Sequence, residues 1–120
     1  MTRRLLVKVT AGADEPERCN QGFTVAAAAV AVGAEVSLWL TGDAAWFGVP
    51  GRAEAFELDL ATPLADLLSV VLTDGQVTVC TQCAQRRGIV ERDLVVGARI
   101  AGAPAFVEEA LTEGVQALVY

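Results

Sequence analysis

The sequence predicts a single α/β domain, a three-layer α/β/α arrangement around a mainly parallel sheet of four or five strands. Short apolar and β-branched runs alternate along the chain with alanine-rich or leucine-rich segments that have helical spacing. The 120 residues, 53% of them hydrophobic, are enough to bury one core. No repeat, linker or low-complexity tract divides the chain, so we expect residues 1–120 to form one domain.

The first part of the chain predicts a strand–helix–strand unit. Arg4–Thr10 is rich in apolar and β-branched residues and predicts the first strand. The alanine-rich segment Glu17–Val32 predicts a helix, with Pro16 near its first turn and Gly33 as a left-handed cap. Glu35–Leu40 predicts the second strand. A unit of this length normally makes a parallel crossover, which places the ligand-side loops at the carboxyl edge of the sheet.

The next segment, Thr41–Gly51, is unusually apolar for a loop because it contains Trp46 and Phe47. Two interpretations stay open. The two rings fold back onto the core of the domain, or they build a site wall or a subunit contact, since large exposed apolar patches usually mark interfaces.

The pattern after this loop predicts a core-facing helix over Pro63–Leu72, with Thr62 as its cap, and then a strand over Gln76–Cys80. The strand runs into a short helix that Gly88 ends. Residues 89–100 fit either the end of a helix or a brief strand, and this segment remains undecided. A last helix follows Pro104 and a last strand closes the chain, at Ala105–Glu113 and Val115–Tyr120.

Composition excludes several classes of function. The chain carries 15 acidic and 9 basic residues, a net charge of −6, which disfavours direct binding of nucleic acid. It contains no histidine, so one chain cannot supply a histidine general base, a histidine-activated nucleophile or a histidine metal ligand. Chemistry must therefore use sulfur, carboxylates or hydroxyls, and we expect no cofactor.

The cysteine count and the apolar runs indicate a soluble protein of the cytoplasm. Three cysteines do not make a disulfide framework, which favours a reducing compartment. The N-terminus starts with basic residues, but Lys8 interrupts its apolar stretch after three residues, so it predicts a strand instead of a signal peptide. The longest apolar run, Val25–Val32, is far shorter than the ~18 residues that span a bilayer.

Candidate chemistry lies where the strand ending at Cys80 turns into a helix carrying Cys83. A thiol at the amino end of a helix faces unpaired backbone N–H groups and the positive end of the helix dipole, which favour the thiolate. Arg86 and Arg87 follow Cys83 by three and four residues, so on a helix at least one of them shares its face. The pattern predicts a thiol of low pKa, with Cys80 in the anion-binding position.

Cys19 and two other kinds of chemistry complete the alternatives. Cys19 lies on the alanine-rich helix, where a cysteine is usually a small buried hydrophobe, although this helix starts at the same sheet edge as Cys80. The C-x-x-C spacing of Cys80 and Cys83 also fits a dithiol redox protein, although it falls late in the chain. A zinc site would need the three thiolates and a carboxylate such as Asp14 or Asp43, and we expect none.

The chain resembles the DsrE-like family of small sulfur-relay proteins, of the DsrE, DsrF and TusD type. The most specific motif is Val79-Cys80 followed by Ala84–Val90. The other segments that carry the resemblance are spread over nearly the whole chain: Asp14–Arg18 at the start of the alanine-rich helix, Gly33–Val36, Gly42-Asp43, and Gly114–Tyr120. Cys83 stands where many members carry a small apolar residue, and the histidine-bearing partner chains of the relay have no counterpart here.

This resemblance implies a function in sulfur transfer. It implies that Cys80 accepts a sulfane sulfur as a persulfide and passes it to a partner protein, as a carrier or a sulfurtransferase. It also implies donor and acceptor proteins as partners, and assembly into a trimer or hexamer with sites near subunit contacts. A purely structural or binding role in an oligomer remains the alternative without chemistry.

Overall fold

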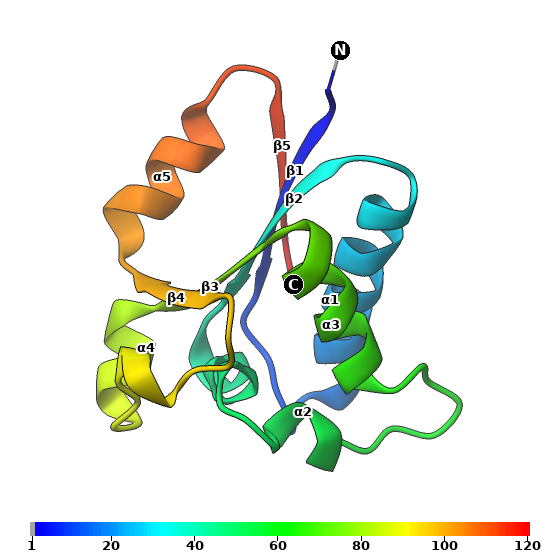
Figure 1. Ribbon diagram of the computed structural model, residues 1–120, viewed down its shortest axis with the longest axis vertical. Helices are drawn as coiled ribbons and strands as arrows, with labels where there is room; N and C mark the ends of the chain where they lie inside the picture. Colours follow the sequence, from blue (N-terminus) through cyan, green and yellow to red (C-terminus); the bar gives the residue numbers. More distant parts are fainter. Residues whose placement is uncertain (1) are drawn as a thin grey trace.

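The computed structural model describes residues 2–120, and its centre is a five-stranded sheet with helices on both faces (Figure 1). All strand pairs are parallel and the strands lie in the order β4-β3-β2-β1-β5. The predicted fold class is therefore confirmed, with five strands. The strands are β1 (Arg4–Val9), β2 (Glu35–Leu40), β3 (Gln76–Cys80), β4 (Ala98–Ala101) and β5 (Val115–Val119).

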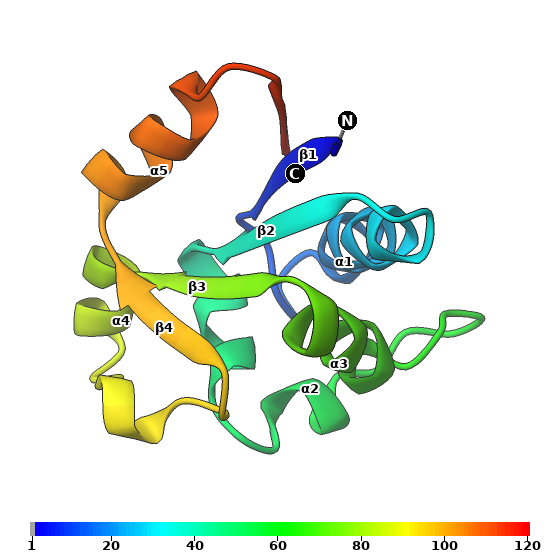
Figure 2. The same ribbon diagram turned by 45° about the horizontal axis from the view of Figure 1, so that its top comes forward.

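The helices form two unequal layers. α1 (Pro16–Ala31) and α3 (Leu64–Asp74) lie side by side on one face of the sheet, and α5 (Ala103–Leu111) lies alone on the other (Figures 1 and 2). α4 (Thr81–Arg86) follows β3 at the carboxyl edge of the sheet. The short α2 (Arg52–Ala55) precedes α3. No helix formed by residues 2–120 combines the length and the apolar character that a membrane crossing requires.

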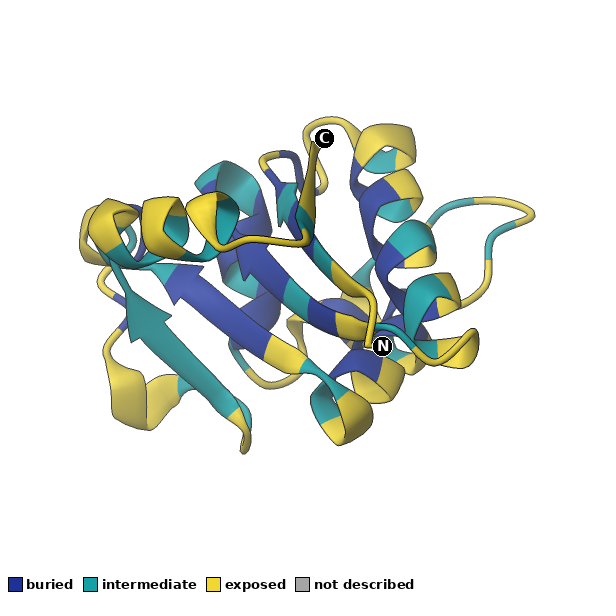
Figure 3. Ribbon diagram, turned by 90° about the horizontal axis from the view of Figure 1, so that it is seen from above, coloured by how far each residue is buried: buried dark blue, intermediate teal, exposed yellow. Residues whose placement is uncertain are grey.

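The core fills the space between the sheet and the α1–α3 layer, as the buried residues in Figure 3 show. On α3 the four predicted core positions are buried, namely Leu64, Leu67, Leu68 and Val71. On α1, Phe23 and two small alanines, Ala26 and Ala27, are buried. Small side chains on α1 let the helix approach the strands closely, which explains the alanine-rich composition of this segment.

Two predicted helix starts were wrong by one or two residues. α3 begins at Leu64, because Pro63 has an extended backbone and its carbonyl accepts the first hydrogen bonds, from the N–H groups of Asp66 and Leu67. Pro63 is therefore the residue before the helix and Thr62 is not its cap. The last helix begins at Ala103, before Pro104, which occupies the first turn where its missing N–H costs nothing.

The apolar loop after β2 forms the 3-10 helix η1 (Gly42–Gly48) and belongs to the core. Phe47 is buried, and its ring lies edge-on to Phe23 at 5.9 Å and to Phe56 at 5.5 Å between centroids. Trp46 is partly exposed, with the Arg52 guanidinium 4.1 Å above its ring. Of the two open interpretations, the core therefore holds for Phe47, and for the partly exposed Trp46 the alternative of a site wall or subunit contact stays a prediction.

The undecided segment contains a 3-10 turn, η2 (Glu91–Asp93), and the edge strand β4. Asp93 caps the turn, since its side chain accepts a hydrogen bond from the Val90 N–H at 3.1 Å. All four residues of β4 are partly buried. The strand therefore lacks the alternation of buried and exposed residues that would mark it in the sequence.

The sheet face under α5 is more polar than the face under α1 and α3. Strand residues that point to it include Arg4, Lys8, Ser37, Gln76 and Thr78, and none of the nine residues of α5 is buried. Parallel strands usually carry apolar residues on both faces because helices cover both. Here one short helix covers the second face, and polar contacts attach it to the strands.

Candidate functional site

The candidate site is centred on Cys80, the last residue of β3 and the residue immediately before α4. Its backbone is extended while the chain turns into the helix directly after it, so its side chain lies beside the first N–H groups of α4. The thiol is partly exposed. This is the position that the sequence predicted for Cys80, and it leaves the sulfur accessible to a small reactant.

Several contacts favour the thiolate form of Cys80. Partial burial raises its pKa, but hydrogen bonds from the backbone N–H groups of Cys83 and Gln82, a hydrogen bond from the Cys83 thiol and the charge of Lys8 all lower it. The net effect places the pKa of Cys80 below its ordinary value of 9.0. A lowered pKa favours the thiolate, which is the nucleophilic form of a cysteine.

Cys83 is buried one turn into α4, and a residue outside this helix contacts its sulfur. The backbone N–H of Gly42 donates a hydrogen bond to Cys83 Sγ at 3.1 Å. Gly42 has a φ of +52°, and a Cβ at this position would lie 2.5 Å from the carbonyl oxygen of Thr10. Glycine is required there by both its backbone and its neighbour, so the end of β2 is shaped to present this N–H to Cys83.

Of the two arginines predicted to share the face of Cys83, Arg87 contacts the Cys83 backbone, and neither is among the groups that lower the pKa of Cys80. Arg87 donates to the carbonyl oxygen of Cys83 at 3.2 Å and lies 3.8 Å from a carboxylate oxygen of Asp43. Arg86 is exposed on the surface of α4. The cation that lowers the pKa of Cys80 is Lys8, which sequence reasoning missed because it is 72 positions away along the chain.

Cys19 is fully buried on α1, and its thiol is kept protonated. Burial and the negative charges of Asp14 and Asp43 raise its pKa to about 12. This environment supports the interpretation of Cys19 as a small core residue and removes the support for a reactive role. Within residues 2–120, no group of three or more cysteine and carboxylate side chains is arranged to hold a metal ion.

The pH dependence of alkylation tests this assignment of the thiols. Only the thiolate reacts with iodoacetamide, so a lowered pKa moves the half-maximal rate for Cys80 to below pH 9.0. Cys19, with a pKa of about 12, should stay unmodified in the folded protein over the same range. Peptide mass spectrometry between about pH 6 and about pH 10 measures both residues. A midpoint for Cys80 at or above 9.0 would contradict the assignment.

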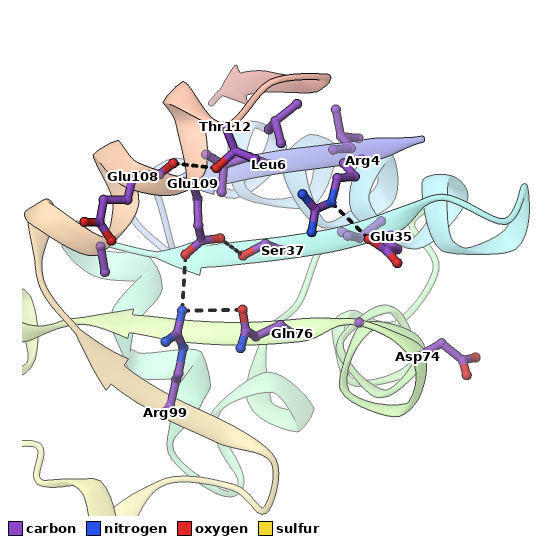
Figure 4. Close-up of a pocket in the computed structure, with 15 residues that line it drawn as sticks. Arg4, Leu6, Glu35, Ser37, Asp74, Gln76, Arg99, Glu108, Glu109 and Thr112 are labelled. Atoms are coloured by element: carbon purple, nitrogen blue, oxygen red, sulfur yellow. Dashed lines mark hydrogen bonds and ion pairs between the residues drawn. The ribbon is translucent and has the colours of Figure 1, made fainter. Parts of the chain in front are cut away.

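A separate cleft of about 610 Å³ lies between α5 and the amino-terminal halves of the central strands (Figure 4). None of the three cysteines lines it. Its central group is Glu109 of α5, which accepts hydrogen bonds from Ser37 Oγ, from Trp39 Nε1 at 3.2 Å and from Arg99 Nη2 at 3.2 Å. This network connects α5 to β2 and β4.

Two solved structures share this fold along nearly the whole chain. The ychN protein of Escherichia coli superimposes with a TM-score of 0.81 at 20% identity and covers 100% of both chains. The protein MTH1491 of Methanobacterium thermoautotrophicum superimposes with a TM-score of 0.70 at 11% identity, covering 98% of this chain and 99% of its own. At these identities the likeness shows the fold alone.

Sequence comparison identifies the family. The uncharacterized protein MJ0760 of Methanocaldococcus jannaschii is 30% identical over 104 residues, which cover 86% of this chain and 38% of that protein. The chain thus spans little more than a third of this relative. The DsrE/DsrF-like family matches residues 3–119. With its five parallel strands and a family match over almost its entire length, the chain belongs to the DsrE/DsrF-like family.

Proposed function

We propose that this protein is a sulfur-relay protein of the cytoplasm, which carries sulfane sulfur as a persulfide on Cys80 and passes it to a partner protein. The observation that carries this proposal is the environment of the Cys80 sulfur. It is partly exposed directly before α4, and the backbone N–H groups of Gln82 and Cys83 together with the Cys83 thiol lower its pKa. Such contacts stabilise an anionic sulfur, and a persulfide keeps its negative charge on the terminal sulfur.

The loading step is a thiol exchange at a sulfane sulfur. The Cys80 thiolate attacks the terminal sulfur of a donor persulfide R–S–SH, and the donor S–S bond breaks. The bonding electron pair leaves with the donor as R–S⁻, while Cys80 becomes Cys80–S–SH, which then loses its proton. Transfer to an acceptor thiolate repeats this exchange in the other direction, so the cycle needs no oxidant and no cofactor.

Cys83 is positioned to act as a resolving thiol. The Cys83 thiol is one of the groups that lower the pKa of Cys80, and the Cys83 sulfur accepts a hydrogen bond from the Gly42 N–H. The Cys83 thiolate can attack the inner sulfur of the persulfide, forming a Cys80–Cys83 disulfide and releasing HS⁻. In this function Cys83 limits the lifetime of the loaded state.

Intact mass after incubation with a sulfane donor tests the proposal. We expect the parent protein to gain about 32 Da for each sulfur atom acquired, and a reductant should remove this mass. Peptide mapping should place the added sulfur on Cys80. If no donor increases the mass of the correctly folded protein, the carrier function is excluded.

A dithiol redox function is the second candidate, and the effect of the Cys83 thiol on the pKa of Cys80 favours it. Oxidation would remove two hydrogen atoms and close the Cys80–Cys83 disulfide, with a mass loss of about 2 Da. The same mass measurement distinguishes the two functions. A carrier gains sulfur from a donor, whereas a purely redox dithiol is converted by the donor to the disulfide without gain.

We further propose that the protein assembles with copies of itself through the α5–β5 side. β5 is an edge strand whose outer backbone groups have no neighbouring strand among residues 2–120. Apolar side chains are exposed beside it: Val107, Leu111, Leu118 and Val119. Light scattering at micromolar concentration should report a trimer or hexamer, and Val119→Lys should lower the mass of the particle. A parent protein that is monomeric under these conditions contradicts the proposal.

A further inference from the structure

Lys8 is the single lysine of the chain and lies on the same sheet face as Cys80. In the parallel register Lys8 of β1 is paired with Trp39 of β2, and Trp39 is paired with Thr78 of β3. Paired residues point to the same face and residues two positions apart on a strand do so as well. The side chain of Cys80 therefore shares the α5 face with Lys8.

An aromatic ring supports the Lys8 ammonium group, and no carboxylate pairs with it. Lys8 Nζ lies 4.9 Å from the centre of the Phe106 ring, and that ring packs edge-on against Trp39 at 5.3 Å. Within residues 2–120 no ion pair includes Lys8, although the side chain is partly buried. The nearby acid of α5, Glu109, is already bound to Arg99.

The Lys8 ammonium group is a partly buried cation without a carboxylate partner among residues 2–120, in a chain of net charge −6, and such a cation favours the binding of an anion. In the part of the chain that the structure describes, the three ion pairs all use arginine. At Lys8 the chain places a compact ammonium group on a flexible stem, which can turn toward a small charged reactant. The aromatic support holds the ammonium group without neutralising its charge.

We propose that Lys8 is the specificity-determining residue of the Cys80 site, where it attracts anionic sulfane donors such as inorganic polysulfide and holds the terminal sulfur anion of the Cys80 persulfide. This inference rests on the proposed function. Under this proposal, the sulfur donor to Cys80 is a small anion that carries a sulfane sulfur. With hydrogen disulfide, HS–S⁻, the Cys80 thiolate bonds to the S–H sulfur, and the second sulfur leaves with the bonding pair and takes a proton from water as HS⁻.

The charge at the site can be measured without any sulfur transfer. Iodoacetate is an anion and iodoacetamide is neutral, and both alkylate the same thiolate. The ratio of their rates at Cys80 therefore does not depend on the fraction of thiolate. We expect Lys8→Met and Lys8→Gln to lower the iodoacetate/iodoacetamide ratio about three- to tenfold, because one positive charge near the sulfur is lost. Lys8→Arg should keep the ratio within about twofold of the parent.

The matched control is Arg3→Met. It changes the net charge by the same amount, but Arg3 is exposed and precedes β1, at the opposite edge of the sheet from Cys80. Circular dichroism establishes whether each variant is folded. The two neutral replacements of Lys8 differ in polarity, and the test can be made with either one if the other does not fold. A ratio unchanged in both neutral variants, or lowered equally by Arg3→Met, overturns the proposal.

Loading from inorganic polysulfide separates this inference from the function on which it rests. We expect the neutral Lys8 variants to gain sulfur several-fold more slowly than the parent, and Lys8→Arg to load at a rate near the parent. A parent that never loads, together with a lowered alkylation ratio in the variants, rejects the carrier function and retains the anion site. Variants that load at the parent rate show that Lys8 does not select the donor.

Discussion

Replacing Cys80 with serine is expected to abolish the gain of sulfur from a sulfane donor. The hydroxyl group of serine is not ionised near neutral pH, so the variant has no nucleophile at the end of β3. The neighbouring thiols do not replace it. Cys83 is buried, and Cys19 is fully buried with a pKa raised to about 12. Intact mass should show the addition of about 32 Da in the parent and none in Cys80→Ser.

Cys83→Ser should have the opposite consequence, because it removes the thiol that would displace sulfide from the persulfide. The loaded state should then persist longer than in the parent, as followed by the decay of the added mass. Cys19→Ser is the matched cysteine control and should load like the parent. Loading in Cys80→Ser but not in Cys83→Ser would reverse the roles of the two thiols.

Much of the fold could be predicted because its buried face follows simple periodicities. The α1–α3 face of β2 and β3 is built from Val36, Leu38 and Val77, which alternate with Glu35, Ser37, Gln76 and Thr78 and, after Leu38, with the buried Trp39. The spacing of Leu64, Leu67 and Leu68 reports the buried side of α3 in the same way. These elements are specified locally, so a window of a few residues contains the information.

Elements that depend on distant partners could not be predicted from such windows. β4 has four partly buried residues and is defined only by its pairing with β3. The 3-10 helix η1 is apolar because Phe47 inserts between Phe23 and Phe56, which come from two separate segments. The sequence therefore left a choice between core and interface for this loop, and tertiary packing decides it for Phe47.

The candidate site also combines features that a local pattern predicts with features that depend on distant residues. The strand end at Cys80 and the position of Cys83 on the following helix were predictable from local pattern. The spacing along α4 predicted that Arg86 or Arg87 shares the face of Cys83; in the structure Arg87 contacts the Cys83 carbonyl and Asp43, whereas the cation that lowers the pKa of Cys80 is Lys8 of β1. Parallel pairing of β1, β2 and β3 places Lys8 on the same face as Cys80, and no spacing within one segment reports it.

The α5 layer connects the fold to the site. α5 contributes no buried residue, so apolar burial alone attaches it weakly. Its attachment depends on Trp39, which contacts Phe106 and donates to Glu109, two residues three positions apart on the helix. Phe106 in turn supports Lys8. The position of the Lys8 cation on the Cys80 face therefore depends on a contact near the carboxyl end of β2.

Trp39→Ala is accordingly expected to destabilise the protein and to release α5. Trp39 is 1% exposed and among the largest fully buried side chains of the chain. Its truncation leaves a cavity and removes one donor from Glu109, at a cost of about 3–5 kcal/mol in the free energy of unfolding, a large share of the total of about 5–15 kcal/mol. Urea denaturation measures the loss, and limited proteolysis should cut near α5 first.

Trp39→Phe separates the packing of Trp39 from its hydrogen bond, and Val96→Ala is a control at an exposed position. Trp39→Phe keeps an aromatic ring against Phe106 but loses the indole N–H, so we expect a cost of about 1 kcal/mol. Val96→Ala removes an apolar side chain that is 97% exposed and should change stability by no more than about 0.5 kcal/mol.

Because Trp39 positions Phe106 and through it Lys8, Trp39→Ala should also lower the iodoacetate/iodoacetamide ratio at Cys80. If α5 stays protected from protease in Trp39→Ala, then Arg99 and Ser37 hold Glu109 without the indole, and the helix does not depend on Trp39.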